Sequence, residues 1–184
     1  DAMSFEEYRT KFPNAEVYSD AMKQRIEQAK KDKGQKMATE QTRKPLHEVF
    51  GISESTKGAL NKQGKPIPIA VLANSSDDFA NQLVPDKDDK YIFNIEYLKT
   101  CVMGLEANIP TYIVGQAGTG KSTLWEQICH STNRPMLRVQ HSGNTEESHV
   151  LGQYLVKDGA TYWEPGPLQL CMKLGITYLA DEYD

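Results

Sequence analysis

The sequence lacks any apolar run close to the roughly 20 residues that a helix needs to cross a bilayer. Its first residues also lack the charged and then apolar pattern of a secretory signal. The formal net charge is −4, which offers no basic surface for DNA or RNA. We therefore expect a cytoplasmic protein for which neither a membrane nor nucleic acid is the default partner.

Cysteine is scarce, and histidine is scattered. The three cysteines, Cys101, Cys129 and Cys171, are isolated and odd in number, which argues against a disulfide framework and against a zinc site. We expect them to be small core residues on helices, in a reducing compartment. The four histidines show no metal-ligand spacing, so ordinary polar or surface roles are expected for all of them: His47, His130, His141 and His149.

The stretch GQAGTGKST, residues 115–123, lies between the apolar run TYIV and the helical pattern LWEQIC. A strand that leads into a glycine-rich turn and then a helix directs backbone N–H groups and the positive end of the helix dipole at one point. Glycines at 115, 118 and 120 allow the backbone to approach a ligand closely. The pattern G-x-x-x-x-G-K-[ST] therefore predicts a loop that binds the phosphates of a nucleotide.

The polar residues of this loop have separate expected roles. Lys121 is expected to reach the β and γ phosphates and to assist catalysis, and the hydroxyl of Ser122 can coordinate Mg²⁺. ATP and Mg²⁺ are thus the expected cofactors. The predicted nucleotide-binding residues are Gly115, Gln116, Ala117, Gly118, Thr119, Gly120, Lys121, Ser122 and Thr123.

A second motif follows roughly sixty residues later, where the apolar strand ITYLA, residues 176–180, ends in two carboxylates. We expect this strand to lie parallel to a strand at 111–114, because ligands of open α/β sheets bind where the carboxyl ends of parallel strands meet. Asp181 is then placed to hold Mg²⁺, and Glu182 to accept a proton from an attacking water.

The rest of the chain divides into three parts. Residues 1–45 read as a polar, helical N-terminal segment, 46–90 as an irregular lead-in in which IPIAVL forms an edge strand, and 91–184 as the nucleotide-binding domain. Within the last part, Asn94 is expected to cap a helix that ends near Asn108 and Pro110.

Further elements are expected after the phosphate loop. The loop should open a helix that is closed by Asn133 and Pro135, and MLRVQ at 136–140 reads as a strand. Asp158-Gly159 between two β-rich runs predicts a hairpin. Pro167 should open a short helix that stops at Gly175, with one apolar side formed by Leu168, Cys171 and Met172.

Several segments in this order resemble the MoxR-type AAA+ ATPases, and in particular the CobS-like subunit of aerobic cobaltochelatase. They are HEVFGI, VPDKDDKYIFN, GQAGTGKSTLWEQI, NRPMLRVQ, LGQYLVKDG, WEPGPL and ITYLADEYD, and together they cover about residues 46–184. The chain departs from CobS at Gln116 and Ala117, where those chains carry Tyr-His, and at His149, where an acidic residue is common. The resemblance therefore supports an ATPase role more directly than a chelatase role.

The resemblance implies an α/β P-loop NTPase domain of the AAA+ type, with a parallel sheet flanked by helices. It places Lys121 and Ser122 on the phosphate loop, Asp181 on the Mg²⁺-linked aspartate and Glu182 on the catalytic glutamate. It also implies a ring, commonly a hexamer, and in many relatives a partner subunit with a von Willebrand A domain. The hairpin at 153–164 corresponds to the insertion that lines or overhangs the pore of the ring.

Two expectations concern the end of the sequence and the alternative functions. In the AAA+ fold a further strand lies between the phosphate-loop strand and the ADEYD strand, so we expect residues 1–184 either to be a fragment of a longer protein or to be completed by a second chain. By themselves they are expected to bind ATP weakly and to hydrolyse it barely. The alternatives are a small-molecule kinase, which shares the phosphate loop, and a nonenzymatic nucleotide switch. A DNA-working motor also stays open, although no basic face supports it.

Overall fold

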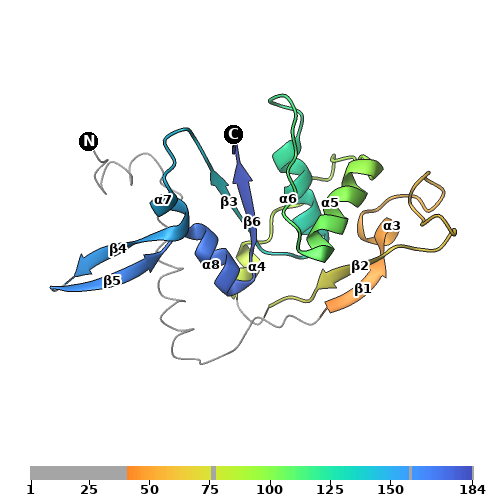
Figure 1. Ribbon diagram of the computed structural model, residues 1–184. Helices are drawn as coiled ribbons and strands as arrows, with labels where there is room; N and C mark the ends of the chain where they lie inside the picture. Colours follow the sequence, from red (N-terminus) through yellow and green to blue (C-terminus); the bar gives the residue numbers. More distant parts are fainter. Residues whose placement is uncertain (1–40, 76–77, 158, 184) are drawn as a thin grey trace. The chain divides into compact units, whose positions relative to one another are not determined.

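The computed structural model describes residues 41–75, 78–157 and 159–183, all of which lie in one unit that spans 39–184 (Figure 1). In chain order the elements are β1 (Gln41–Pro45), α3 (Leu46–Val49), β2 (Pro68–Leu72), α4 (Asp78–Gln82), α5 (Ile95–Ala107), α6 (Lys121–Ser131), β3 (Met136–Gln140), α7 (Glu147–Leu151), β4 (Gly152–Lys157), β5 (Ala160–Pro165), α8 (Pro167–Leu174) and β6 (Thr177–Asp181). Residues 1–40 of the predicted polar helical segment lie outside the described residues.

The first sheet consists of β1 and β2, which pair antiparallel from Gln41 opposite Leu72 to Pro45 opposite Pro68. The expected edge strand in IPIAVL is therefore confirmed as β2. Its proline lies at the first position of the strand, where a missing N–H costs least. The partner strand β1 falls in the part of the chain predicted to be a polar helical segment, and for residues 41–45 that prediction is wrong. The strand was missed because QTRKP has neither apolar alternation nor β-branched residues beyond Thr42.

The main core lies between these N-terminal elements and the two longer helices. Its buried residues come from α3 and the turn after it, β2, α5 and α6: Leu46, Phe50, Ile69, Leu98, Cys101, Val102, Leu124 and Ile128. The lead-in therefore packs against the apolar faces of α5 and α6. Helix α6, which follows the phosphate loop, is fixed in this core by Leu124 and Ile128.

Helix α5 begins and ends where the sequence predicts. The side chain of Asn94 accepts hydrogen bonds from the amides of Glu96 at 3.0 Å and Tyr97 at 3.3 Å, as an N-cap does. Asn108 ends the helix in the left-handed region, with φ of 52°. None of the helices in the described ranges is long and apolar enough to cross a membrane.

The strands β3 and β6 form a parallel pair, in which Met136 lies opposite Thr177 and Gln140 opposite Asp181. Both strands were predicted within one residue of their bounds. Helix α8 contacts both strands, and α6 contacts β6 (Figure 1). The prediction that Met172 lies on the buried side of α8 is wrong, because it is exposed and Leu170 is buried beside Cys171 instead.

The segment at 111–114 was predicted to be a strand of the same sheet, and this prediction is wrong for the described residues. Within the described ranges these residues have no strand partner. Ile113 packs against the main core, whereas Tyr112 and Val114 are 69% and 80% exposed. The backbone alternates in burial as a strand does, but a strand also needs neighbouring N–H and C=O groups to pair with.

The predicted hairpin is present as β4 and β5, which pair antiparallel from Gly152 opposite Pro165 to Lys157 opposite Ala160. Its turn residue Asp158 lies outside the described residues. The rings of Tyr154 and Trp163 meet edge to face with centroids 4.9 Å apart. The indole Nε1 of Trp163 donates to Oε1 of Gln169 in α8 at 2.7 Å. The base of the hairpin is thereby linked to α8.

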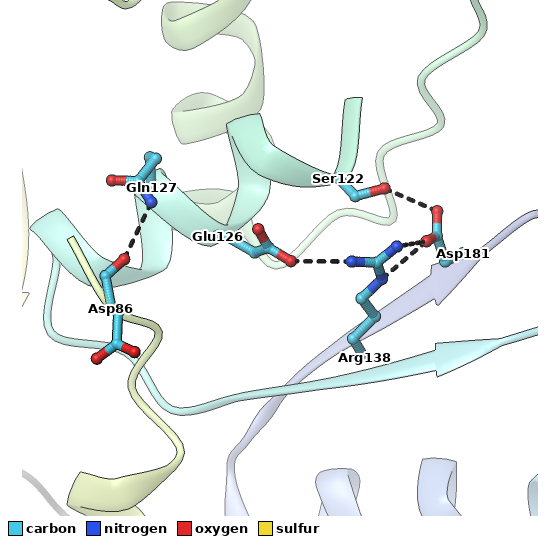
Figure 2. A network of polar contacts seen from close by, with 6 residues as sticks. All are labelled: Asp86, Ser122, Glu126, Gln127, Arg138 and Asp181. Carbon is cyan, nitrogen blue, oxygen red and sulfur yellow. Dashed lines mark hydrogen bonds and ion pairs between the residues drawn. The ribbon is translucent and has the colours of Figure 1, made fainter. Parts of the chain in front are cut away.

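The chain before α5 is fastened to α6 by the side chain of Gln127, which is buried. Its Nε2 donates to the carbonyl of Asp86 at 3.0 Å (Figure 2). Its Oε1 accepts from the amide of Asp88 at 2.9 Å. One side chain thus satisfies two backbone groups that would otherwise lose their partners.

We predict that Gln127→Leu lowers the free energy of unfolding by about 1–3 kcal/mol, because the leucine fills similar space but leaves these two backbone groups unpaired. Urea denaturation followed by tryptophan fluorescence measures the change. Gln63→Leu, the same replacement at an exposed turn, is the control and should leave the stability nearly unchanged. Equal stability of the two variants would contradict the anchoring role.

Candidate functional site

The phosphate loop at 115–120 is an exposed turn that leads into the first residue of α6, Lys121. Gly118 and Gly120 both have φ of 79°, a conformation that residues with a side chain rarely adopt. Gly120 is the N-cap, and no side chain caps the helix. The amides of the first turn of α6 therefore lack a capping side chain and are suited to an anion.

The side chain of Lys121 folds back over the loop. Its Nζ donates to the carbonyls of Gly115 at 2.7 Å and Gln116 at 2.8 Å. Thr119 adds a hydrogen bond from its hydroxyl to the carbonyl of Gln116 at 2.9 Å. The ammonium group is thus held at the loop by neutral carbonyl oxygens, for which phosphate oxygens are the stronger, charged replacement.

Ser122, on the first turn of α6, brings the two predicted halves of the site together. Its Oγ donates to Oδ1 of Asp181, the last residue of β6, at 2.8 Å (Figure 2). These two residues lie 59 positions apart in the sequence. The contact forms because α6 packs on β6 with its first turn beside the carboxyl end of that strand.

Asp181 is an ionised group in a mostly covered position, since its side chain is 15% exposed. Burial alone would raise the pKa of Asp181, but the hydrogen bonds from Ser122 and Arg138, together with the positive charge of Arg138, outweigh it and lower the pKa below its ordinary value. A carboxylate that stays ionised at neutral pH is what a site for a hard cation requires.

Glu182 follows directly, and its backbone lies in the left-handed region with φ of 54°. Its side chain is not in the contact between Ser122 and Asp181. Instead, Nε2 of Gln140 donates to Oε2 of Glu182 at 2.7 Å. Gln140 lies opposite Asp181 in the parallel pair, so the ends of both strands carry polar side chains at the same edge.

The remaining predicted residues of the loop are Gln116, Ala117 and Thr123. Gln116 supplies a carbonyl to both Lys121 and Thr119, and Ala117 lies in the exposed turn. Thr123 is the third residue of α6 and is half-buried.

Sequence reasoning missed two polar residues of β3, Arg138 and Gln140. Arg138 bonds Asp181 and Glu126 of α6, and Gln140 bonds Glu182. A signal was present, since strands of parallel sheets are usually apolar on both faces, and MLRVQ carries polar residues at alternate positions on one face. Those positions point to the face where the site lies.

The cysteines take the structural role that was expected of them. All three are buried, and they lie on α5, α6 and α8. Burial raises the pKa of Cys129 and of Cys171 to about 12. Both thiols are therefore neutral at physiological pH and unsuited to nucleophilic chemistry. His141 is also buried, and its Nε2 lies 2.9 Å from the hydroxyl of Tyr178.

Comparisons with known proteins agree with this geometry. Residues 110–184 match the family described as AAA domain (dynein-related subfamily). The chain is 32% identical over 141 residues to the aerobic cobaltochelatase subunit CobS of Sinorhizobium sp, an alignment that covers 74% of this chain and 42% of that protein. Protein NorQ of Paracoccus denitrificans (strain Pd 1222) is 28% identical over 75 residues, which cover 41% of this chain and 28% of NorQ.

A third relative is the von Willebrand factor A domain-containing protein 8 of Mus musculus. It is 37% identical over 73 residues, or 39% of this chain and 4% of that protein. The chain therefore spans less than half the length of each of these three relatives.

We predict that Gly120→Ala lowers the free energy of unfolding by about 1–2 kcal/mol, because an added Cβ meets no atom but is strained in the left-handed conformation. Chemical denaturation measures this change. Gly143→Ala is the matched control, because it also lies in open space but does not need a positive φ. It should be neutral or slightly stabilising. A loss of stability in both variants, or in neither, would contradict the assignment of strain to Gly120.

Proposed function

We propose that this chain, an AAA+ ATPase of the MoxR type close to CobS, binds ATP with Mg²⁺ at residues 115–123 and hydrolyses it with Glu182 as the general base. The observation that carries this proposal is the hydrogen bond from Ser122 to Asp181. It joins the phosphate loop helix to the acidic end of β6 and so supports one shared site for the phosphates and the carboxylates.

The loop is suited to hold the phosphates of ATP. In the proposed complex, Lys121 exchanges the carbonyls of Gly115 and Gln116 for oxygens of the β and γ phosphates, and the uncapped amides at the start of α6 bind the same groups. The exchange is favourable because the ammonium group then faces negatively charged phosphate oxygens instead of neutral carbonyl oxygens.

The donors at the site also fit Mg²⁺. A hydroxyl and an ionised carboxylate, 2.8 Å apart, are hard oxygen ligands of the kind that this cation prefers. We propose that Ser122 and Asp181 hold it, directly or through water. When bound there, the cation would neutralise negative charge on the phosphates and so lower the barrier to their cleavage.

Hydrolysis needs a base for the attacking water. In the proposed step, Glu182 accepts one proton as the water oxygen bonds to the γ phosphorus, and the bond from that phosphorus to the bridging oxygen of ADP breaks. Glu182 makes a hydrogen bond with Gln140 in the described structure, so a water must replace that partner or share the carboxylate with it.

We propose that hydrolysis is coupled to the remodelling of a client protein or to metal chelation. The first relative named above is a cobaltochelatase subunit, which makes chelation one candidate. The hairpin β4–β5 offers exposed apolar and aromatic side chains, including Tyr154 and Val156, to a client or a neighbouring subunit. Its link to α8 through Trp163 gives a path from the hairpin to β6 and the site.

The proposal includes assembly and location. AAA+ proteins of the MoxR type typically form rings, so we propose a ring, with a hexamer as the expected size. We also propose a partner with a von Willebrand A domain. One relative supports this, because its name records such a domain and another part of it is similar to this chain. We place the protein in the cytoplasm, where ATP is available.

Residues 1–184 by themselves are proposed to hydrolyse ATP barely. The segment at 111–114, which leads into the phosphate loop, has no strand partner among the described residues. The segment is held by the packing of Ile113 on the main core and by a hydrogen bond from the hydroxyl of Tyr112 to the carbonyl of Tyr183 at 3.2 Å, and not by the hydrogen bonds of a sheet, which favours weak binding of the nucleotide.

We predict that Glu182→Gln keeps the affinity for ATP within about threefold and lowers kcat for hydrolysis by about 10²–10⁴-fold, because general base catalysis contributes about that factor. Isothermal titration calorimetry and phosphate release in the full-length protein measure the two quantities.

Glu54→Gln, at an exposed loop position, is the control and should change neither quantity. Full hydrolysis by Glu182→Gln would contradict the role of Glu182 as base. Transfer of phosphate to an added small molecule that survives this substitution would favour the kinase alternative instead.

A further inference from the structure

Four side chains form a continuous series of contacts between α6 and the parallel pair β3–β6 (Figure 2). Ser122 donates to Oδ1 of Asp181 at 2.8 Å. Arg138 donates from Nε to Oδ2 of Asp181 at 2.8 Å, and its Nη2 contacts the same oxygen. Nη1 of Arg138 bonds Oε1 of Glu126 at 3.1 Å.

The spacing of these residues explains why the series begins and ends on the same helix. Ser122 and Glu126 are four residues apart on α6 and therefore lie on one face of it. Arg138 lies two positions before Gln140, the residue opposite Asp181, so it projects to the same face of β3 as Gln140 does. The guanidinium thus spans the distance from the helix to the strand end.

Arg138 is a poor candidate for a residue that serves stability alone. Its side chain is 49% exposed, so water weakens its ion pairs with the more covered carboxylates of Asp181 and Glu126, and partly exposed pairs contribute only modestly to the free energy of folding. Its geometry gives the two carboxylate oxygens of Asp181 different partners, because Arg138 bonds Oδ2 and Ser122 bonds Oδ1. The planar guanidinium suits this role because its donors have a fixed direction.

We propose that Arg138 is a positioning residue for the cation that accompanies the nucleotide, because it orients Asp181 through Oδ2 and keeps Oδ1 turned toward Ser122. Glu126 in turn fixes the guanidinium from α6. The inference rests on the proposed nucleotide-binding function. Arg138 lies in β3, outside both the phosphate loop and the acidic motif.

A purely electrostatic role makes the opposite prediction. If Arg138 acted only through its charge, it would repel a cation, and its removal would tighten cation binding. If it positions Asp181, its removal weakens cation binding, because residues that hold a metal ligand in place are typically worth 10–100-fold in metal affinity.

The experiment uses Mn²⁺ as the probe, in the full-length protein with ADP. Electron paramagnetic resonance measures the binding of Mn²⁺, and a fluorescent ADP analogue in EDTA measures nucleotide binding without a cation. The variants are Arg138→Met, which keeps the apolar stem, Arg138→Lys, which keeps the charge without the planar guanidinium, and Glu126→Gln. Arg43→Met is the matched control, since Arg43 is 62% exposed and pairs with Glu106 at 3.2 Å outside the site.

We expect Arg138→Met to weaken Mn²⁺ binding by about tenfold, with nucleotide binding in EDTA unchanged within about twofold. Arg138→Lys should be intermediate, Glu126→Gln should weaken Mn²⁺ binding by a smaller factor, and Arg43→Met should match the wild type. If Arg138→Met does not fold, Arg138→Lys and Glu126→Gln decide the matter, and wild-type Mn²⁺ binding in both overturns the inference.

Three other results would also overturn it. They are unchanged or tighter Mn²⁺ binding in Arg138→Met, wild-type binding in Arg138→Lys, and an equal loss of nucleotide binding in EDTA, which would indicate a structural role. A wild-type protein that binds no ADP even with Mn²⁺ would instead reject the proposed function, so the two failures are distinguishable.

Discussion

The hydrogen bond between Ser122 and Asp181 joins two parts of the molecule that are held in place by different packing. Helix α6 is fixed by Leu124 and Ile128 in the main core, which it shares with α5 and the N-terminal elements. Strand β6 is fixed by its parallel pairing with β3 and by contact with α8. The candidate site exists where these two parts meet, so its geometry depends on the packing of both.

The charged side chains at this junction differ in the kind of partner that they have. The carboxylates of Asp181 and Glu126 share the guanidinium of Arg138, whereas the ammonium of Lys121 is satisfied by carbonyls of its own loop. Glu182 makes its hydrogen bond with Gln140 rather than with a cation. The cation of the loop is thus held by neutral partners, which a triphosphate can replace at little electrostatic cost.

Local signals predicted much of the fold. The cap at Asn94, a helix after the phosphate loop, the strands β3 and β6, and the hairpin around Gly159 all follow from rules that act over a few residues. The failures concern pairing at long range. Residues 111–114 have the composition of a strand but no partner among the described residues, and Gln41–Pro45 lacks that composition but pairs with β2.

For the site, the sequence alone determined which chemical groups are present, because a glycine-rich loop before a helix and carboxylates after an apolar strand are local patterns. It did not determine which oxygen of Asp181 meets Ser122, that Gln140 reaches Glu182, or that Arg138 connects Asp181 to Glu126. Only the tertiary structure decided these contacts. The physical reason is that they depend on the register of β3 against β6 and on how α6 packs over that pair, and both are set by residues far apart in the chain.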